Sequence, residues 1–453
     1  MEPESWDGEI EKILEIPARF VDVTLQSSKT TSILSKDGVA KDISTGELSG
    51  ICIRVLDKGW GFASSNDLKD IYALATRAYK IAKRVKREIK FEVVDAVEDR
   101  VKVKPRIDPA SVGIEEKREI LSSAEDAIAD LDGIVSSSFS YFDSNTRISY
   151  LNSEGSRIEA EYPRVAVFSS VFAKKGAKLQ IGLERLGATA GLEALEKVGD
   201  SSRKAGEKAL SLLDAKEAPR GNFQVVLDSK LTGVFIHEAL GHAVEADHVI
   251  QGESILEDKL GKAIASELVT VFDDPTIDGS FGFYFYDSEG TRAMKKVVVK
   301  NGVLKSYLHS RETSSEMGHI NTGNARSQSY AYQPLVRMSN TYLEPGDFEF
   351  EEIVDVAKGV YLKGSKGGEV DTVRGVFQFS AEEGFLIENG EITTPVRDVA
   401  LSGRTLDILK NVDAVGKDFG IHIGFCGKGA QSVPVGDGGP HMRTFATVGG
   451  TVH

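Results

Sequence analysis

Residues 134–173 read IVSSSFSYFDSNTRISYLNSEGSRIEAEYPRVAVFSSVFA, and apolar and polar side chains alternate over most of this stretch. Alternation with a period of two is typical of a half-buried β-strand. The pattern predicts strands at 134–141, 147–151, 157–162 and 166–173, separated by polar turns at 143–145 and 152–155. Such a meander predicts one antiparallel sheet with one face to cover.

Strand and turn signals continue on both sides of this stretch. A Lys36-Asp37-Gly38 turn and a hairpin formed by 50–55 and 60–63 predict antiparallel strands near the amino terminus. Helical periodicity predicts helices over 66–82, 115–131 and 192–213. We expect three segments, namely an α+β domain at 1–104, a middle helix-and-meander segment at 105–219, and a β-rich catalytic domain at 220–453.

The last segment contains the clearest hairpin signals. Asn301-Gly302 and Asn389-Gly390 each lie between two apolar runs, and Asn-Gly is the strongest short-range signal for a two-residue hairpin turn. A helix is expected from about Ser229 to Asp247. The fold class predicted for the whole chain is therefore α+β, with antiparallel sheets and a few long helices.

Composition excludes several classes of function. The chain has 453 residues and a net charge of −14, which disfavours nucleic acid or anionic lipid as a general partner. It has two cysteines, Cys52 and Cys426, so a disulfide framework is not expected and a reducing compartment is. No run of apolar residues approaches the length of a membrane span, and Met1–Glu15 lacks a signal core. These features predict a cytoplasmic protein that does not bind membranes.

The residues that indicate chemistry lie at 235–248, FIHEALGHAVEADH, where three of the eight histidines fall within twelve positions. In a zinc-peptidase motif, His-Glu-x-x-His, the two histidines are four positions apart and point the same way. Here His237 and His242 are five apart, which places them about 140° apart on a regular helix. They converge if the helix widens into a π turn, and Gly241 gives the backbone room to do so. We therefore predict a bulge or break near 239–242.

Three interpretations of this segment remain open from the cluster alone. In the first, His237 and His242 bind zinc and Glu238 is the general base. In the second, the helix is regular, and the ligands are Glu238 with His242 or His242 with Glu245. In the third, the histidines are ordinary partners of Glu245 and Asp247 at a domain contact.

A third metal ligand is expected from elsewhere in the chain, because catalytic zinc usually has three protein ligands and one open position. Cys426 is the best candidate, since glycines flank it at 424 and 427 and thiolate suits zinc. Lys428 would favour the thiolate form. Cys52 lies in an alternating strand and is interpreted as a small buried apolar residue.

With these residues in view, the chain resembles the TldD branch of the TldD/PmbA family of metallopeptidases. The resemblance rests on His237-Glu238-Ala239-Leu240-Gly241-His242 together with Gly424-Phe425-Cys426-Gly427-Lys428. Further blocks match in the same order and extend the resemblance over nearly the whole chain: 35–38, 50–55, 286–291, 322–326, 337–341, 367–371 and 431–436.

The resemblance implies that Zn²⁺ is held by His237, His242 and Cys426, with Glu238 as general base. It implies hydrolysis of short or unfolded peptides by a homodimer, or by a heterodimer with a PmbA (TldE)-type chain that lacks the metal residues. We expect broad specificity directed at the peptide backbone. The alternatives are a non-catalytic dimer scaffold with a structural metal and a hydrolase of a non-peptide amide. Further candidates for contacts around the metal or the substrate are Glu245, His422 and Lys428.

Overall fold

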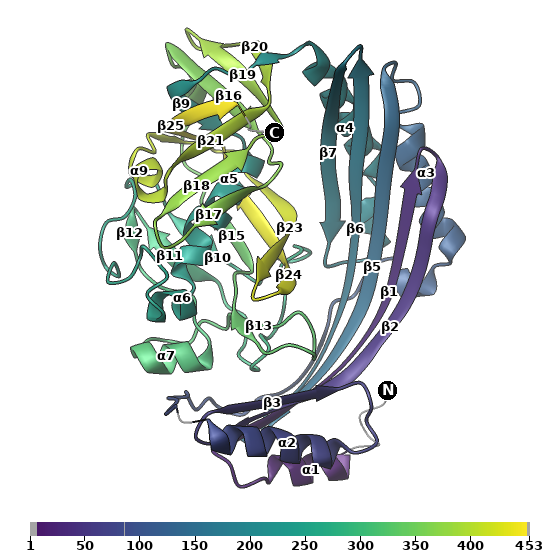
Figure 1. Cartoon of the computed structure of the whole chain (residues 1–453), viewed down its shortest axis with the longest axis vertical. Helices are drawn as coiled ribbons and strands as arrows, with labels where there is room; N and C mark the ends of the chain where they lie inside the picture. The colour runs from purple at the N-terminus through teal and green to yellow at the C-terminus, as the bar shows by residue number, and fades with distance from the viewer. Residues whose placement is uncertain (1–6, 86, 451–453) are drawn as a thin grey trace.

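The computed structural model describes residues 7–85 and 87–450. Residues 1–6, at the start of the first expected segment, and residues 451–453, at the end of the last one, lie outside the described residues. A long curved sheet occupies one side of the molecule, and the β-rich C-terminal half lies against it (Figure 1). Helices and antiparallel sheets occur in both parts, which confirms the predicted α+β class.

Within the described residues the long sheet has seven strands in the order β3-β2-β1-β5-β6-β4, with β7 also paired to β6. The amino-terminal and middle segments therefore share one sheet, because β1 pairs with both β2 and β5. Its strands are β1 (Phe20–Lys36), β2 (Val39–Leu56), β3 (Trp60–Ser65), β4 (Glu98–Lys102), β5 (Ile134–Asn152), β6 (Arg157–Lys175) and β7 (Lys178–Ala188).

Helices cover this sheet at two places. At one end α1 (Asp7–Leu14) and α2 (Ile71–Arg84) pack against β1 to β3, and at the other end α3 and α4 pack against β5 to β7 (Figure 1). The latter are α3 (Ile114–Asp126) and α4 (Val198–Asp214), each preceded by a short 3₁₀ turn, η2 (Pro109–Ser111) and η3 (Leu192–Leu195). The apolar positions of α1 and α2 share one core with the sheet, and those of α3 and α4 share another.

The turn expected at 143–145 is wrong, because β5 runs without a break through these polar residues. Their backbone groups pair with β1 on one side and with β6 on the other. Asp143 is buried, and its carboxylate lies 2.6 Å from Lys117 Nζ of α3 and accepts a hydrogen bond from Tyr141. Partners from distant segments thus keep a locally turn-like stretch extended.

The break expected between 162 and 166 is also wrong, because β6 continues through Pro163. Proline has no N–H to donate, so within a sheet it needs a position without a partner on that side. On the outer edge of β6, the pairing with β4 ends at Glu161 and the pairing with β7 begins at Val165. Pro163 falls in the interval between these two partners.

The C-terminal half contains two larger sheets and a small one. The ten-stranded sheet comprises β8 (Lys216–Glu217), β9 (Gly221–Leu227), β16 (Lys358–Lys363), β17 (Gly368–Asp371), β18 (Val376–Ser380), β19 (Glu383–Glu388), β20 (Glu391–Arg397), β21 (Val399–Arg404), β22 (Ala414–Val415) and β25 (Met442–Gly450). The six-stranded sheet, in the order β12-β11-β10-β15-β24-β23, comprises β10 (Val271–Asp273), β11 (Lys296–Lys300), β12 (Val303–Leu304), β15 (Asn340–Leu343), β23 (Gly420–Lys428) and β24 (Gln431–Gly439).

The predicted hairpins at Asn301-Gly302 and Asn389-Gly390 are both confirmed, between β11 and β12 and between β19 and β20. All four residues have positive φ, as this turn type requires. The remaining elements are the pair β13 (Ala325–Arg326) and β14 (Leu335–Val336) and the helices α5 (Ser229–Phe235), α6 (Ala246–Ile250), α7 (Arg311–Met317), α8 (Phe350–Val354) and α9 (Thr405–Lys410).

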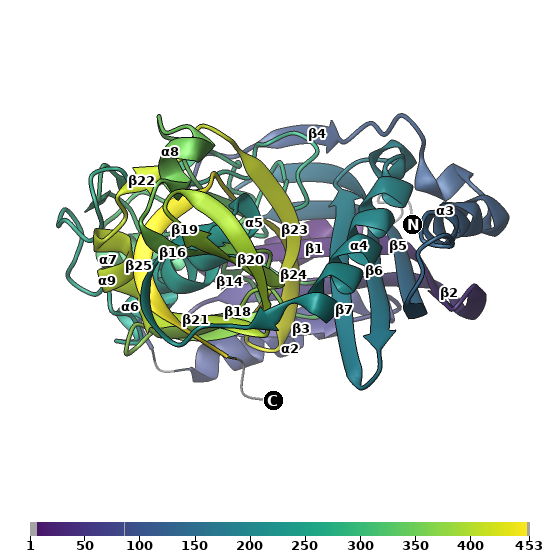
Figure 2. The same cartoon turned by 90° about the horizontal axis from the view of Figure 1, so that it is seen from above.

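The two halves meet along the strand pair β23–β24, which faces the long sheet (Figures 1 and 2). A buried charge cluster also joins them, because Glu382 binds Lys208 of α4 and its Oε1 lies 2.7 Å from Lys230 Nζ of α5. Burial would raise the pKa of Glu382, but the two ammonium groups outweigh burial and lower it.

Candidate metal centre

The helical segment that carries the histidines begins directly after β9. Asp228 accepts a hydrogen bond from Leu231 N–H at 2.8 Å and caps α5, which continues into a π turn over Ile236–Gly241 and a 3₁₀ turn over His242–Val244. The His242 N–H bonds to the carbonyl of His237, five residues earlier. The distortion predicted near 239–242 is therefore confirmed.

Gly241 is needed here for a different reason from the one expected. Its φ of −57° and ψ of −49° are ordinary helical values that any residue can adopt. A Cβ atom at this position would, however, lie 1.9 Å from Met338 Sδ, and Met338 is fully buried. The close approach of this side chain, rather than backbone freedom, requires glycine.

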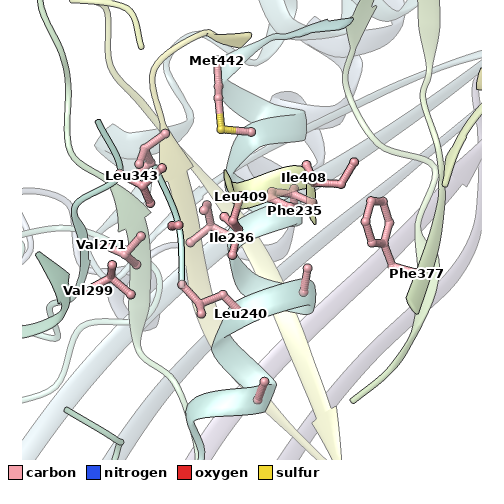
Figure 3. Close-up of a cluster of buried hydrophobic side chains, with 14 of the residues drawn as sticks. Phe235, Ile236, Leu240, Val271, Val299, Leu343, Phe377, Ile408, Leu409 and Met442 are labelled. Atoms are coloured by element: carbon pink, nitrogen blue, oxygen red, sulfur yellow. The ribbon is translucent and has the colours of Figure 1, made fainter. Parts of the chain in front are cut away.

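Apolar side chains on the rest of the segment hold it in place. Phe235, Ile236 and Leu240 are fully buried and pack into the largest apolar core of the C-terminal half. Figure 3 shows them pointing from the helix toward residues of β10, β11 and β15 on one side and toward Phe377 on the other. The histidines are thus carried by a segment that is anchored on several sides.

Cys426 comes from β23, far away in sequence. It lies opposite Val433 of β24, and β24 is held between β23 and β15. Its Sγ lies 3.6 Å from His242 Nε2. The rings of His237 and His242 are 5.3 Å apart and almost perpendicular, and one ligand atom from each of the three residues lies within 4.8 Å of the other two. The fold therefore brings the three predicted ligands together.

These three residues fit a zinc ion. Zn–S bonds of about 2.3 Å and Zn–N bonds of about 2.05 Å that meet at a tetrahedral angle place sulfur and nitrogen about 3.6 Å apart. The Sγ–Nε2 separation has this value. All three side chains are buried, whereas the neighbouring Glu238 side chain is 34% exposed, and its Oε2 lies 3.8 Å from His242 Nε2. A carboxylate is thus accessible beside a buried N,N,S donor set.

A carboxylate lies against each imidazole. His242 Nδ1 lies 3.0 Å from Glu245 Oε2, and His237 Nδ1 lies 2.7 Å from Asp437 Oδ1. A carboxylate on one ring nitrogen leaves the other available for a metal, and this is the usual arrangement around ligating histidines. Sequence reasoning had selected Glu245 but missed Asp437, which lies among glycines in β24 and has no local motif. Asp437 could have been found only through the register of the β23–β24 hairpin, which places it opposite His422.

The other two sequence candidates occupy less direct positions. Lys428 Nζ lies 3.0 Å from Glu245 and 2.7 Å from Asp247, so it contacts the carboxylate behind His242 rather than the thiol. Lys428 was expected to favour the thiolate form of Cys426. In the structure it instead lowers the pKa of Glu245, the carboxylate that contacts His242. His422 Nε2 lies 3.1 Å from Ser229 Oγ, at the start of α5.

The charges of this cluster favour a thiolate. Burial would raise the pKa of Cys426, but His237 and His242 more than compensate and lower it to about 6. Burial would likewise lower the pKa of His242, yet Glu245 and Cys426 raise it to about 10. Burial would raise the pKa of Glu245, which His242 and Lys428 instead lower to about 2. The cluster is thus a network of groups that shift one another's pKa values, which is typical of a functional site.

Models of known protein families cover most of the chain. The PmbA/TldA metallopeptidase domain 1 matches residues 21–82, the central domain matches 107–213, and the C-terminal domain matches 220–450. The chain belongs to the TldD/PmbA family of metallopeptidases. The predicted resemblance to the TldD/PmbA family is confirmed, and the metallopeptidase class follows from it.

Relatives of this TldD/PmbA protein extend over almost its full length. A metalloprotease of Methanothermobacter thermautotrophicus is 50% identical over 98% of both chains. A zinc metalloprotease TldD homolog of Saccharolobus solfataricus is 30% identical over 96% of this chain and 97% of its own. The fold resembles the crystal structure of TldE from Thermococcus kodakarensis, with a TM-score of 0.81, 18% identity and 99% coverage of both chains.

A second solved structure shows the same fold. It is a Thermotoga maritima protein described as a candidate modulator of a DNA gyrase, with a TM-score of 0.84, 22% identity, and coverage of 98% of this chain and all of that one. Among the described residues, no helix has both the length and the apolar character required to cross a membrane.

Proposed function

We propose that this protein is a zinc-dependent peptidase in which His237, His242 and Cys426 hold the ion and Glu238 is the general base. The observation that carries the proposal is the 3.6 Å contact between Cys426 Sγ and His242 Nε2, which joins two segments 184 residues apart beside an accessible carboxylate. A purely structural zinc site usually has a fourth protein ligand. An N,N,S set with a neighbouring free carboxylate is better suited to catalysis.

The residues of this chain would divide the work as follows. A zinc ion supplies Lewis acidity, which polarises the scissile carbonyl and makes a water molecule easier to deprotonate. Glu238 takes the proton from the attacking water and passes it to the leaving amine. Asp437 and Glu245 hold the imidazole rings of His237 and His242 with their second nitrogens toward the ion.

The placement of Cys426 favours an extended peptide as substrate. β23 is the last strand of the six-stranded sheet and pairs with β24 on one side only, within the described residues. A peptide can add to such an edge as a further strand, and main-chain hydrogen bonds then give affinity for many sequences. Because this edge faces the long sheet, folded proteins would have poor access, so we propose short or unfolded peptides as substrates.

The complete set of metal residues supports assignment as the TldD-type, catalytic subunit. We propose that it works as a dimer, either with a second copy of itself or with a TldE-type partner. Both cysteines are free and buried, as is typical of proteins in a reducing compartment, and this supports a cytoplasmic location.

Two pairs of measurements test the proposal. Purified protein should contain about one zinc per chain, and Glu238→Gln should retain that zinc while peptide cleavage, followed by mass spectrometry, falls by at least about a hundredfold. Cys426→Ser should lose zinc, whereas Cys52→Ser, at a buried cysteine of the long sheet, should retain it. Full peptidase activity after removal of all metal would refute the mechanism, and zinc without any cleavage would favour a scaffold.

A further inference from the structure

A cavity of about 160 Å³ lies where the long sheet meets the C-terminal half. Its walls include residues of β1, β2, β5 and β6 from the sheet and several tyrosines from both halves. Val433 and Pro434 of β24 also line it, and these two residues pair with Cys426 and Phe425. The cavity therefore adjoins the strand pair that carries the proposed sulfur ligand.

Two arginines in the cavity wall use only part of their hydrogen-bonding capacity. Arg164 donates from Nε and Nη2 to the carbonyls of Phe281 and Phe283, at 3.4 and 3.1 Å. Arg326 donates from Nη1 and Nη2 to the carbonyls of Met338 and Pro434. Within residues 7–85 and 87–450, Arg164 Nη1 and Arg326 Nε have no hydrogen-bond partner.

Neither guanidinium group is neutralised by a carboxylate. Among the residues that the structure describes, none places a carboxylate oxygen within 4.0 Å of Arg164 or Arg326. Arg54, which also lines the cavity, is by contrast paired with Asp22 and with Glu289. Arg326 is buried and Arg164 is half-buried. An unpaired charge that is shielded from water is costly, so two such cations without a counter-ion call for an explanation.

The other charged groups that line the cavity do not neutralise the two guanidinium groups. Asp287 is the one carboxylate among the described lining residues, and its oxygens accept hydrogen bonds from the backbone N–H groups of Glu289, Thr291 and Ala325. Burial and, second to it, the positive charge of Arg326 lower the pKa of Arg164 to about 10. The two cations are thus close enough to repel each other.

Aromatic rings support both guanidinium groups. The Cζ atom of Arg164 lies 5.5 Å from the centre of the Tyr162 ring, and that of Arg326 lies 5.1 Å from the centre of the Tyr284 ring. Stacking on a ring fixes a guanidinium plane. The unused donors are Nη1 of Arg164 and Nε of Arg326, so each arginine can donate to one oxygen of a carboxylate.

We propose that this cavity binds a carboxylate group of the peptide substrate between Arg164 and Arg326. The volume suits the end of one residue and is too small for a nucleotide-sized ligand, which needs at least about 300 Å³. Because an extended chain advances about 3.3 Å per residue, a carboxylate bound here lies within a few residues of the proposed metal site. The inference rests on the proposed peptidase function.

The test measures binding without turnover, with Glu238→Gln protein and isothermal titration calorimetry. Three N-acetylated alanine–valine pentapeptides are compared: one with a free C-terminal carboxylate, one with a C-terminal amide, and one amide with a single glutamate. The peptide acid should bind about tenfold or more tightly than the plain amide. Adding Arg164→Met should reduce this preference to below about threefold, whereas adding Arg185→Met, at an exposed position of β7, should leave it unchanged.

The outcomes separate the two proposals. If the protein without a substitution in the cavity binds the acid and the plain amide equally, the proposed carboxylate site is refuted. A preference for the acid that survives Arg164→Met refutes it too. Arg164→Lys, which retains the charge, should show an intermediate preference. Tight binding of the glutamate amide assigns the site to a side-chain carboxylate, and tight binding of the acid alone assigns it to the C-terminus. If zinc-loaded wild-type protein cleaves none of the peptides but the preference persists, only the peptidase proposal fails.

Discussion

Replacement of Gly241 by alanine tests the packing that shapes the π turn. The new Cβ would lie 1.9 Å from Met338 Sδ, whereas ordinary contacts of this kind begin at 3.4 Å, so the two groups must separate by about 1.5 Å. Met338 is fully buried and cannot move into solvent. Overpacking of this kind typically costs about 1–3 kcal/mol.

The same displacement acts on the metal site, because His242 directly follows Gly241 in the chain. A shift of about 1 Å at a catalytic group can reduce activity about a hundredfold. We therefore expect Gly241→Ala to lower the free energy of unfolding, measured in urea, by about 1–3 kcal/mol and to weaken zinc retention. Gly427→Ala is the matched control, since no atom lies within 4 Å of a Cβ at that position beside Cys426.

A double-mutant cycle identifies the contact responsible. Met338→Ala alone should destabilise the protein by about 2–5 kcal/mol, because it opens a cavity. In combination with Gly241→Ala, the loss should be smaller than the sum of the single losses by about 1 kcal/mol or more, since the new methyl group occupies the vacated space. Strict additivity, or a Gly241→Ala protein as stable as Gly427→Ala, would refute the packing argument.

Three further substitutions test contacts found only in the structure. Asp437→Asn should weaken zinc binding about tenfold to a hundredfold in a competitive chelator titration. It should also lower the urea midpoint of the metal-free protein, because the charge of Asp437 stabilises the protonated His237. Glu382→Gln should destabilise the protein by about 3 kcal/mol at pH 7. A carboxylate with a lowered pKa stabilises the folded state only while it is ionised. The difference in unfolding free energy from wild type should therefore shrink as the pH falls below 4.5. Lys428→Met should cost about 3 kcal/mol, because it removes the ammonium partner of Asp247 and one of the two cationic partners of the fully buried Glu245. Lys417→Met, in an exposed ion pair, should leave the urea midpoint nearly unchanged.

Local patterns in the sequence were sufficient for several features. The Asn-Gly hairpins at 301–302 and 389–390 follow from two residues that tolerate positive φ between apolar runs. The π turn was predicted from the five-residue spacing of His237 and His242, because two side chains at this spacing face the same way only if the helix widens. These predictions succeeded because the deciding interactions involve residues near each other in the chain.

Other features depended on contacts between distant segments. The stretch 143–145 has the composition of a turn but is held extended by β1 and β6, and Gly241 is required by Met338, about a hundred positions away. No local pattern reveals which polar group a buried charge will meet, because strand register and domain packing decide it.

The site itself shows the same division. Local sequence patterns predicted the α+β class, and the resemblance of several motifs to the TldD/PmbA family implied the proposed set His237, Glu238, His242 and Cys426. Only the tertiary structure decided that Asp437 lies against the first imidazole and that Arg164 and Arg326 share one cavity without a counter-ion. The physical reason is that few residue types can bind a metal ion, and their positions can be read directly from the sequence. The electrostatic surroundings of a site are instead the sum of charges that the fold gathers from every part of the chain.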